Sequence, residues 1–280
     1  MSIIDSLGML IARKWIAGVD LGHAMRDAKK YNSKKENVIM NYLGEDLKSK
    51  KLVEQNKGQI LALLDRMHSE KIKGSIAVKP TQIGIAISKS YFAANYSEIL
   101  EKASVCGFTV WLDMEQFEYV KGTIDMYLRF CRKYDTGICI QAKLRQSLKD
   151  IQRIVKQNGR IRLVKGAYKY TNAISFQEKQ EVYSNYIKCM DYLFAHSKKF
   201  MIATHDERII NIARNKEKKT GKKIQFGMLK GIRPQLAAKL AESEDMNIYM
   251  PYGEQWLEYS MRRLSEWEHA KIILRSIMQG

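Results

Sequence analysis

The stretch IRLVKGAYKY, residues 161–170, begins as a buried strand and then changes character. Its first letters, IRLV, are typical of a parallel strand that is covered on both faces. A cation, Lys165, follows at once, and the small residues Gly166 and Ala167 come next. Because small residues leave space beside that cation, the pattern predicts that a large, flat, anionic group lies at the end of this strand.

Short β-rich apolar runs like this one recur along the whole chain. Stretches with helical periodicity separate them, such as QILALLDRMHSEKI at 59–72 and YVKGTIDMYLRFCRKY at 119–134. Alternation of this kind predicts parallel βαβ units. The runs begin at Asn37, Ser75, Thr109, Gly137, Ile161, Phe200, Ile224 and Asn247.

Eight such units in 280 residues predict an α/β fold, a (β/α)8 barrel of the TIM type, as a single domain over residues 1–280. A doubly wound sheet is the alternative, but no GxGxxG motif follows any of the runs. A further helix, LGHAMRDAKKYN at 21–32, precedes the first strand. The last helical stretch, QWLEYSMRRLSEWEHAKIILRSIM at 255–278, is expected to lie over the barrel mouth.

The charge balance favours an anionic partner, since Lys and Arg number 48 against 30 Asp and Glu, a formal net charge of +18. The lysines are dispersed, however, and no RNP motif or zinc-finger spacing accompanies them, so nucleic acid is not the expected partner. The four cysteines show no CxxC spacing, which suits reduced thiols in a reducing compartment.

The first 18 residues are too short and too charged for a membrane span, so the chain is expected in the cytoplasm. No metal site is expected, because no second His or Cys stands at a ligand spacing from the histidine near a strand end.

Functional side chains gather where the predicted strands end, which is where barrel enzymes carry their chemistry. Strands that only pack against helices would end in turn formers such as Gly, Asn or Ser. The strand ends carry Tyr42, Glu45, Lys79, Thr81, Gln82, Asp113, Glu115, Gln141, Lys143, Lys165, Tyr168, Thr204, His205, Asp206, Leu229, Lys230, Tyr249 and Tyr252.

Four motifs at these positions resemble the flavin-dependent, monofunctional proline dehydrogenase family: LVKGAY, ATHDERII, GIRPQL and YMPYGEQWLEYSMRRLSE. The resemblance covers nearly the whole chain and keeps the family's order. It implies that FAD is the cofactor and that L-proline is oxidised to pyrroline-5-carboxylate by hydride transfer to flavin N5, the first step of proline catabolism. A membrane quinone is the implied electron acceptor, reached by peripheral association with the inner face of the membrane.

The resemblance also assigns a cofactor-binding set around the strand at 161–164. Arg162 is expected near flavin N5, where a guanidinium stabilises negative charge on the ring. Lys165 supplies a second cation, and the small residues Gly166 and Ala167 let the ring approach the backbone. The other implied cofactor contacts are Met114, Gln141, Val164, Lys179, Thr204, His205, Asp206 and Glu266.

The implied substrate site is a carboxylate clamp of Arg262, Arg263 and Lys79, with Asp113 holding the charge network in place. Lys79, Asp113 and Arg162 form the expected catalytic set. A bulky Tyr249 favours proline over hydroxyproline. The implied wall around the proline ring consists of Ala167, Tyr168, Leu229, Tyr249 and Tyr259.

Three positions depart from the family pattern: Gly227 stands where Gln is usual, Lys143 where an aromatic is common, and Pro80 where an aliphatic is usual. These changes concern flavin affinity more than the class of reaction. Two other functions stay open from the residues: a flavin dehydrogenase of another cyclic or N-alkyl amino acid, and a basic nucleic-acid-binding barrel without flavin.

Overall fold

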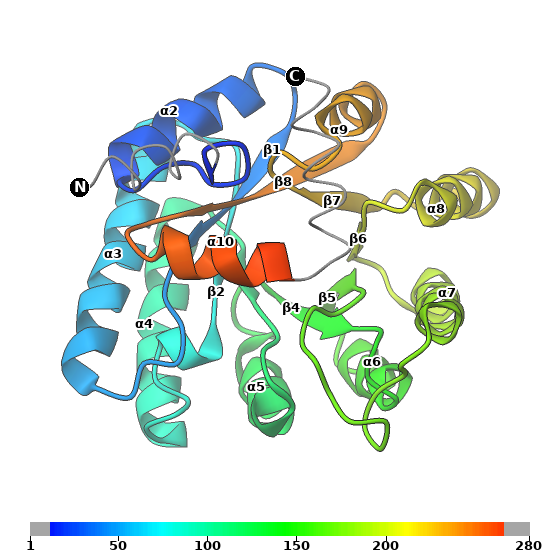
Figure 1. Ribbon diagram of the computed structural model, residues 1–280, viewed down its shortest axis with the longest axis horizontal. Helices are drawn as coiled ribbons and strands as arrows, with labels where there is room; N and C mark the ends of the chain where they lie inside the picture. The colour runs from blue at the N-terminus through cyan, green and yellow to red at the C-terminus, as the bar shows by residue number, and fades with distance from the viewer. Residues whose placement is uncertain (1–11, 266–280) are drawn as a thin grey trace.

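In the computed structural model, which describes residues 12–265 and the side chains of residues 12–261, eight parallel strands close into a barrel in sequence order (Figure 1). The predicted TIM-type fold is confirmed. The strands are β1 (Asn37–Tyr42), β2 (Gly74–Val78), β3 (Val110–Leu112), β4 (Thr136–Gln141), β5 (Arg160–Val164), β6 (Phe200–Ala203), β7 (Gln225–Leu229) and β8 (Asp245–Tyr252).

Every predicted strand is present, and its start differs from the prediction by two residues or fewer. The largest difference is at β8, which begins at Asp245 rather than Asn247, because pairing with Gln225 of β7 starts before the apolar run does. Polar residues therefore occupy the first positions of several strands. All six residues of β4 are buried, as a strand covered on both faces requires.

Helices follow the strands and cover the outside of the barrel, while α2 (Leu21–Asn32) packs against β1 and β8 (Figure 1). A short 3-10 turn, η1 (Pro80–Gln82), follows β2. The outer helices are α3 (Lys50–Ser69), α4 (Lys89–Cys106), α5 (Phe117–Phe130), α6 (Ser147–Val155), α7 (Lys179–His196), α8 (Glu207–Thr220) and α9 (Pro234–Ala241).

The barrel interior is packed with side chains and is not a pore. Trp111 is 1% exposed and forms a cluster with Ile39, Ala77 and Met201 inside the ring of strands. Gly137 on the neighbouring β4 makes room for the indole, since a Cβ there would lie 2.4 Å from Cζ3 of Trp111. This floor confines any ligand to the end of the barrel where the strands finish.

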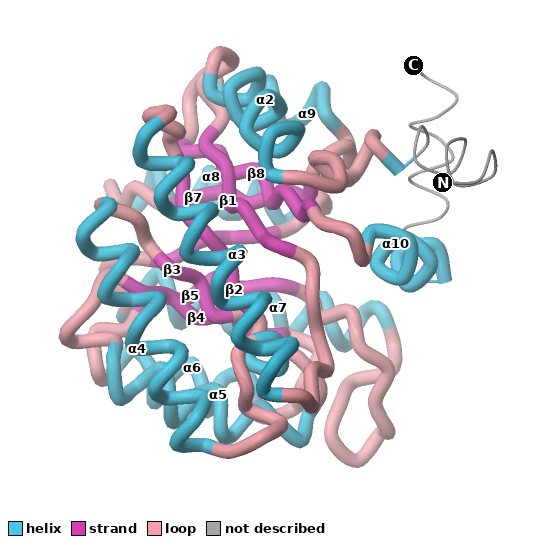
Figure 2. Tube along the Cα trace, turned by 90° about the vertical axis from the view of Figure 1, so that its left-hand side faces the viewer, coloured by secondary structure: helices cyan, strands magenta, loops and turns pink. Residues whose placement is uncertain are grey.

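The last described helix, α10 (Trp256–Ser265), lies beyond the ends of the strands instead of on the outside of the barrel (Figure 2). Trp15 donates its indole N–H to Ser260 Oγ at 3.0 Å. Tyr259 and Trp256 of α10 pack in one apolar cluster with Trp15, against which Leu229 at the end of β7 also packs. The expected helix over the barrel mouth is confirmed.

Two glycine substitutions separate packing inside the barrel from helix propensity outside it. Gly137→Ala should lower the free energy of unfolding by about 1–3 kcal/mol, because its methyl group collides with the immobile Trp111 ring. Gly58→Ala, in an exposed turn of α3 with nothing within 4 Å, should raise it by roughly 0.5–1 kcal/mol. Urea denaturation checks both values, and a Gly137→Ala protein as stable as the wild type would contradict the packing.

Candidate functional site

Three strands bring a buried charge cluster together at the barrel mouth. Arg162 of β5 forms an ion pair and a hydrogen bond with Asp113, the residue directly after β3. Tyr249 of β8 donates its hydroxyl to the other oxygen of Asp113 at 2.7 Å. The Arg162 guanidinium also lies 5.3 Å from the centroid of the Tyr249 ring and 5.4 Å from that of Trp111, within range of cation–π attraction.

Arg162 is 4% exposed, yet it keeps its charge. Burial, the largest single influence, acts to lower its pKa, but the Asp113 carboxylate together with Cys139 and Tyr249 raises the pKa of Arg162 above its usual range. Its Nη1 atom is buried without a hydrogen-bond partner in the described part of the chain. An unsatisfied buried donor costs about 1–3 kcal/mol, so the mouth favours a ligand that offers an acceptor.

Lys79 and Asp113 belong to two different ion pairs. Lys79, directly after β2 and 7% exposed, donates to Glu45 on the segment after β1. Asp113, which was expected to hold the charge network of the mouth in place, accepts hydrogen bonds from Arg162 and Tyr249.

Glu115 is a buried carboxylate to which no role was assigned from the sequence. Its two oxygens accept hydrogen bonds from the backbone N–H and the hydroxyl of Thr81, both at 2.8 Å. Gln141 donates to the backbone carbonyl of Glu115 at 3.0 Å. Burial raises the pKa of Glu115 to about 6, with Lys79 acting in the opposite direction. The sequence does place Glu115 at the end of β3, only two residues after Asp113, and this second carboxylate was the signal that could have identified it.

The loop after β5 is held by side chains of β4 and of the segment that follows it. Gly166 has φ +103, and a Cβ there would lie 2.9 Å from Oε1 of Gln141. Lys143 donates to the Tyr168 carbonyl at 3.1 Å, and the Tyr170 hydroxyl bonds Gln141 at 3.3 Å. Glycine is thus required at 166 by backbone conformation and by packing, besides any role in admitting a ring.

The segment after β6 carries the predicted Thr204, His205 and Asp206. The Leu229 N–H donates to Nε2 of His205 at 2.9 Å, which requires that this nitrogen be unprotonated. Asp206 caps α8 and lies 3.9 Å from the Lys165 ammonium. Hydrogen bonds from Arg208 are the main cause that lowers the pKa of Asp206.

The remaining predicted residues are spread around this cluster. Met114 is buried in the main core, Val164 ends β5 half-buried, and Ala167 is exposed. Lys179 is an exposed residue that starts α7. The side chains of Arg262 and Arg263 lie outside the described ones, although both residues belong to α10, and Glu266 lies outside the described residues.

Gly227 is closely packed, because a Cβ there would lie 2.9 Å from Met201 Sδ and 3.1 Å from Ala203 Cβ. The Met201 side chain fills the space beside this position. Pro80, another departure from the family pattern, starts η1, where its missing N–H and fixed φ are tolerated.

The residues present fit a flavin. The Nη1 group of Arg162 is a buried donor without a hydrogen-bond acceptor in the described part of the chain, and the flavin ring carries several acceptor atoms. The Lys165 side chain is 46% exposed, so its ammonium remains accessible to an anionic group. In residues 12–265 no group of three His, Cys, Asp or Glu side chains could hold a metal ion.

A family model described as proline dehydrogenase matches residues 24–272. Proline dehydrogenase 2 of Bacillus subtilis is 31% identical over 260 residues, which cover 91% of this chain and 86% of that protein. Proline dehydrogenase of Deinococcus radiodurans is 26% identical over 281 residues, covering 96% and 91%.

Among solved structures, proline utilization A from Bdellovibrio bacteriovorus has a TM-score of 0.88 at 22% identity. The match covers 93% of this chain and 33% of that chain, so this chain spans about a third of the solved protein's length. At this identity the likeness supports the barrel fold.

The raised pKa of Glu115 predicts a pH-dependent stability. The folded state holds the Glu115 proton more tightly than the unfolded chain, so this contribution is complete below pH 4.5 and is lost as the pH rises through about 6. A difference of ~1.5 units corresponds to about 2 kcal/mol. Relative to Glu115→Gln, the wild-type free energy of unfolding should therefore fall by about 2 kcal/mol between pH 4.5 and pH 7.

Urea denaturation at several pH values measures this difference. Glu118→Gln, which removes an exposed carboxylate at the start of α5, controls for the loss of one acidic group. A wild-type minus Glu115→Gln difference that stays constant with pH would contradict the assignment.

Proposed function

The chain belongs to the proline dehydrogenase family, and on that premise we propose that it oxidises L-proline to pyrroline-5-carboxylate with FAD as the hydride acceptor. Proline oxidation is the first step of proline catabolism, and the enzyme is an oxidoreductase that acts on a CH–NH bond. Loss of hydride from C5 forms a double bond to the ring nitrogen, so proline must enter with that nitrogen unprotonated. The protein's own task is then to orient the substrate and to match its charges.

The observation that carries this proposal is the buried Arg162 with an unpaired N–H in the barrel mouth. A guanidinium is protonated at any physiological pH, and the ion pair with Asp113 holds this one in place. Such a fixed positive charge stabilises negative charge that develops on an adjacent acceptor. The Tyr249 hydroxyl bond to Asp113 keeps that carboxylate in place. Arg162 is therefore the proposed electrostatic centre of the reaction, and Asp113 its positioning partner.

The proposed substrate clamp consists of Arg262 and Arg263 on α10, opposite the strand ends. Its support is the position of α10 over the mouth and the contact of Tyr259 with the cluster at Leu229. Lys79 completes the set of cations. Paired guanidinium groups bind a carboxylate through two parallel hydrogen bonds, which a lysine cannot reproduce. Ala167, Tyr168 and Tyr249 complete the proposed wall around the proline ring.

The proposed FAD-binding residues surround Arg162 on β4, β5 and β6. The loop after β5 approaches the acidic start of α8 through the Lys165–Asp206 pair. Residues proposed to hold FAD are Met114, Gln141, Arg162, Val164, Lys165, Gly166, Ala167, Lys179, Thr204, His205, Asp206 and Glu266.

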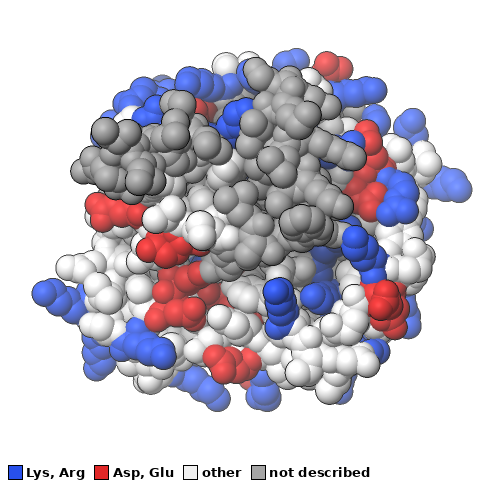
Figure 3. All heavy atoms as spheres, in the orientation of Figure 1, with Lys and Arg blue, Asp and Glu red and all other residues white. Residues whose placement is uncertain are grey.

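A membrane quinone is the proposed electron acceptor, and the cytoplasmic face of the membrane the proposed site of action. Within residues 12–265, no helix is long and apolar enough to cross a bilayer. Lys and Arg side chains are spread around the edge of the face shown in Figure 3. With a formal net charge of +18, long-range attraction to anionic lipid supports peripheral docking.

Anaerobic mixing of the flavin-loaded protein with L-proline should abolish the visible flavin absorbance. Arg262→Met should raise the proline concentration needed for half-reduction by about a hundredfold, because one charge-assisted carboxylate contact is worth up to ~3 kcal/mol. Arg153→Met removes an exposed arginine from α6 and should leave that concentration unchanged. A spectrum that proline never alters would refute the proposed reaction, and equal behaviour of the two variants would refute the clamp.

Binding to membranes is expected to depend on charge. The protein should sediment with anionic phosphatidylglycerol vesicles at about 20 mM salt and remain in the supernatant at about 500 mM, where the Debye length falls below ~5 Å. Neutral phosphatidylcholine vesicles are the control. Sedimentation that is absent at low salt, or equal for both lipids, would remove the support for peripheral docking.

A further inference from the structure

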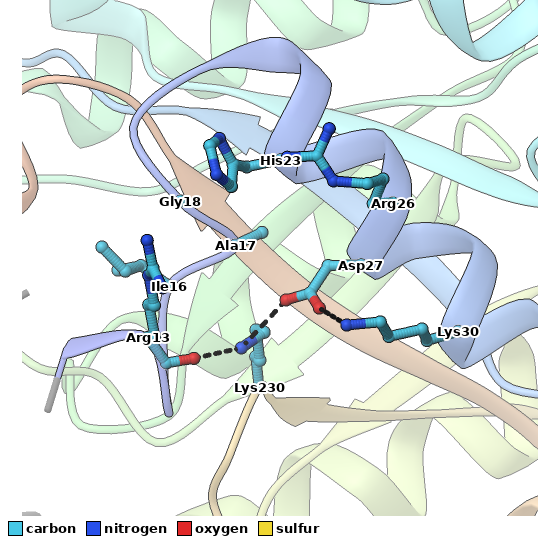
Figure 4. Close-up of a pocket in the computed structure, with 9 residues that line it drawn as sticks. All are labelled: Arg13, Ile16, Ala17, Gly18, His23, Arg26, Asp27, Lys30 and Lys230. Atoms are coloured by element: carbon cyan, nitrogen blue, oxygen red, sulfur yellow. Dashed lines mark hydrogen bonds and ion pairs between the residues drawn. The ribbon is translucent and has the colours of Figure 1, made fainter. Parts of the chain in front are cut away.

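A cavity of about 260 Å³ lies between segment 13–18, α2 and the end of β7, and Arg162, Asp113 and Tyr249 do not line it. Its walls are segment 13–18, the residues of α2 from His23 to Lys30, and Lys230 after β7 (Figure 4). The proposed oxidation of proline uses none of the residues around it. Its polar lining consists of Arg13, His23, Arg26, Asp27, Lys30 and Lys230.

Positive charge dominates this lining. Four cationic side chains stand against the single carboxylate of Asp27, which leaves three positive charges. Asp27 is already shared, because its two oxygens lie 3.2 Å from the Lys230 ammonium and 3.6 Å from the Lys30 ammonium. The guanidinium groups of Arg13 and Arg26 add the remaining charge (Figure 4).

Lys230 is the buried member of the group, with a side chain that is 6% exposed. Its ammonium donates to the carbonyls of Arg13 at 2.6 Å and Lys14 at 3.5 Å and lies 3.2 Å from Asp27 Oδ2, so it contributes charge to the cavity while its donors stay within the protein. Burial is the main cause that lowers the pKa of Lys230, and nearby Lys30 lowers it further, while Asp27 acts against both. The lining as a whole, with four cations and one carboxylate, keeps a positive charge that favours an anion.

The walls of the cavity are fixed by the backbone. Ala17 N–H donates to the Pro251 carbonyl at 2.8 Å, and Gly253 N–H donates to the Gly18 carbonyl at 3.0 Å. Gly231, next to Lys230, has φ +73, and a Cβ there would lie 1.8 Å from the Lys14 carbonyl oxygen. Only glycine permits this close approach of the two segments, so the cavity is formed before any ligand arrives.

We propose that this cavity binds a small phosphate-type dianion. The lining carries a net charge of +3 from segment 13–18, α2 and the loop after β7, which matches a multiply charged anion, and the exposed Arg13 and Arg26 can each bind a phosphate with two parallel hydrogen bonds. A monocarboxylate would leave two of the three charges unpaired. The phosphate can belong to inorganic phosphate or to a lipid head group, since both present the same oxygens.

Occupancy would also steady the roof of the active site. Arg13 belongs to the segment that contains Trp15, and Trp15 is hydrogen-bonded to Ser260 of α10. A dianion that bridges Arg13 to Arg26 of α2 would hold this segment against the barrel, in addition to the hydrogen bonds from Lys230 to Arg13 and Lys14. The inference does not depend on proline oxidation, because the binding is measured without substrate.

Isothermal titration of the full-length protein with inorganic phosphate, at constant ionic strength, tests the site. Arg26→Gln should weaken phosphate binding by about tenfold, corresponding to the loss of one charge-assisted contact. Lys29→Gln removes the same charge from the same helix outside the cavity and should leave the affinity unchanged. Arg26 and Lys29 are both exposed, so folding of these variants is expected to be normal.

A second variant, Lys230→Met, should abolish binding, with circular dichroism to confirm that the protein is folded. Sedimentation with phosphatidylglycerol vesicles identifies the source of the phosphate. If Arg26→Gln and Lys230→Met lose vesicle binding while Lys29→Gln keeps it, and inorganic phosphate gives no binding heat with the wild type, the site is assigned to a lipid head group. The proposal would be overturned if the wild type bound neither phosphate nor vesicles. It would also be overturned if all variants, including Lys29→Gln, weakened binding equally.

Discussion

The buried ion pair between Arg162 and Asp113 is the interaction on which the site depends. Breaking a buried pair by removing one partner typically costs about 3–5 kcal/mol, because the remaining charge is left uncompensated. The pair stands on the Trp111 ring and is tied to a third strand by the Tyr249 hydroxyl. A charge held in this way cannot reorient toward water, and a fixed charge is what electrostatic catalysis requires.

Two carboxylates at the end of β3 show how one short segment supplies different chemistry. Asp113 is paired with a guanidinium, whereas Glu115 accepts hydrogen bonds from Thr81 in a buried environment that raises its pKa to about 6. The first holds the proposed electrostatic centre, and the second secures the turn after β2, next to Lys79. The two neighbouring carboxylates therefore differ in pKa and in bonding partners because their environments differ, and not because of their residue types.

Two segments that are far apart in the sequence, around Trp15 and in α10, together cover the barrel mouth. Trp15 and Ser260 are far apart in sequence, yet their hydrogen bond and the cluster around Tyr259 hold α10 across the strand ends. Lys230 and Gly231 secure the same N-terminal segment from the loop after β7. The helix α10, which carries the proposed substrate clamp, is therefore connected through this segment to the basic cavity beside α2.

Local patterns in the sequence determined the strands, their order and the functional residues at their ends, because apolar runs, helical periodicity and turn residues act over a few positions. They did not reveal that Asp113 pairs with Arg162, 49 residues away, that Lys79 pairs with Glu45, or that Trp111 requires Gly137 beside it. Those partners depend on which strands become neighbours and on where each side chain ends in the closed barrel. Only the tertiary structure decides that, since packing and ion pairing act through space while periodicity acts along the chain.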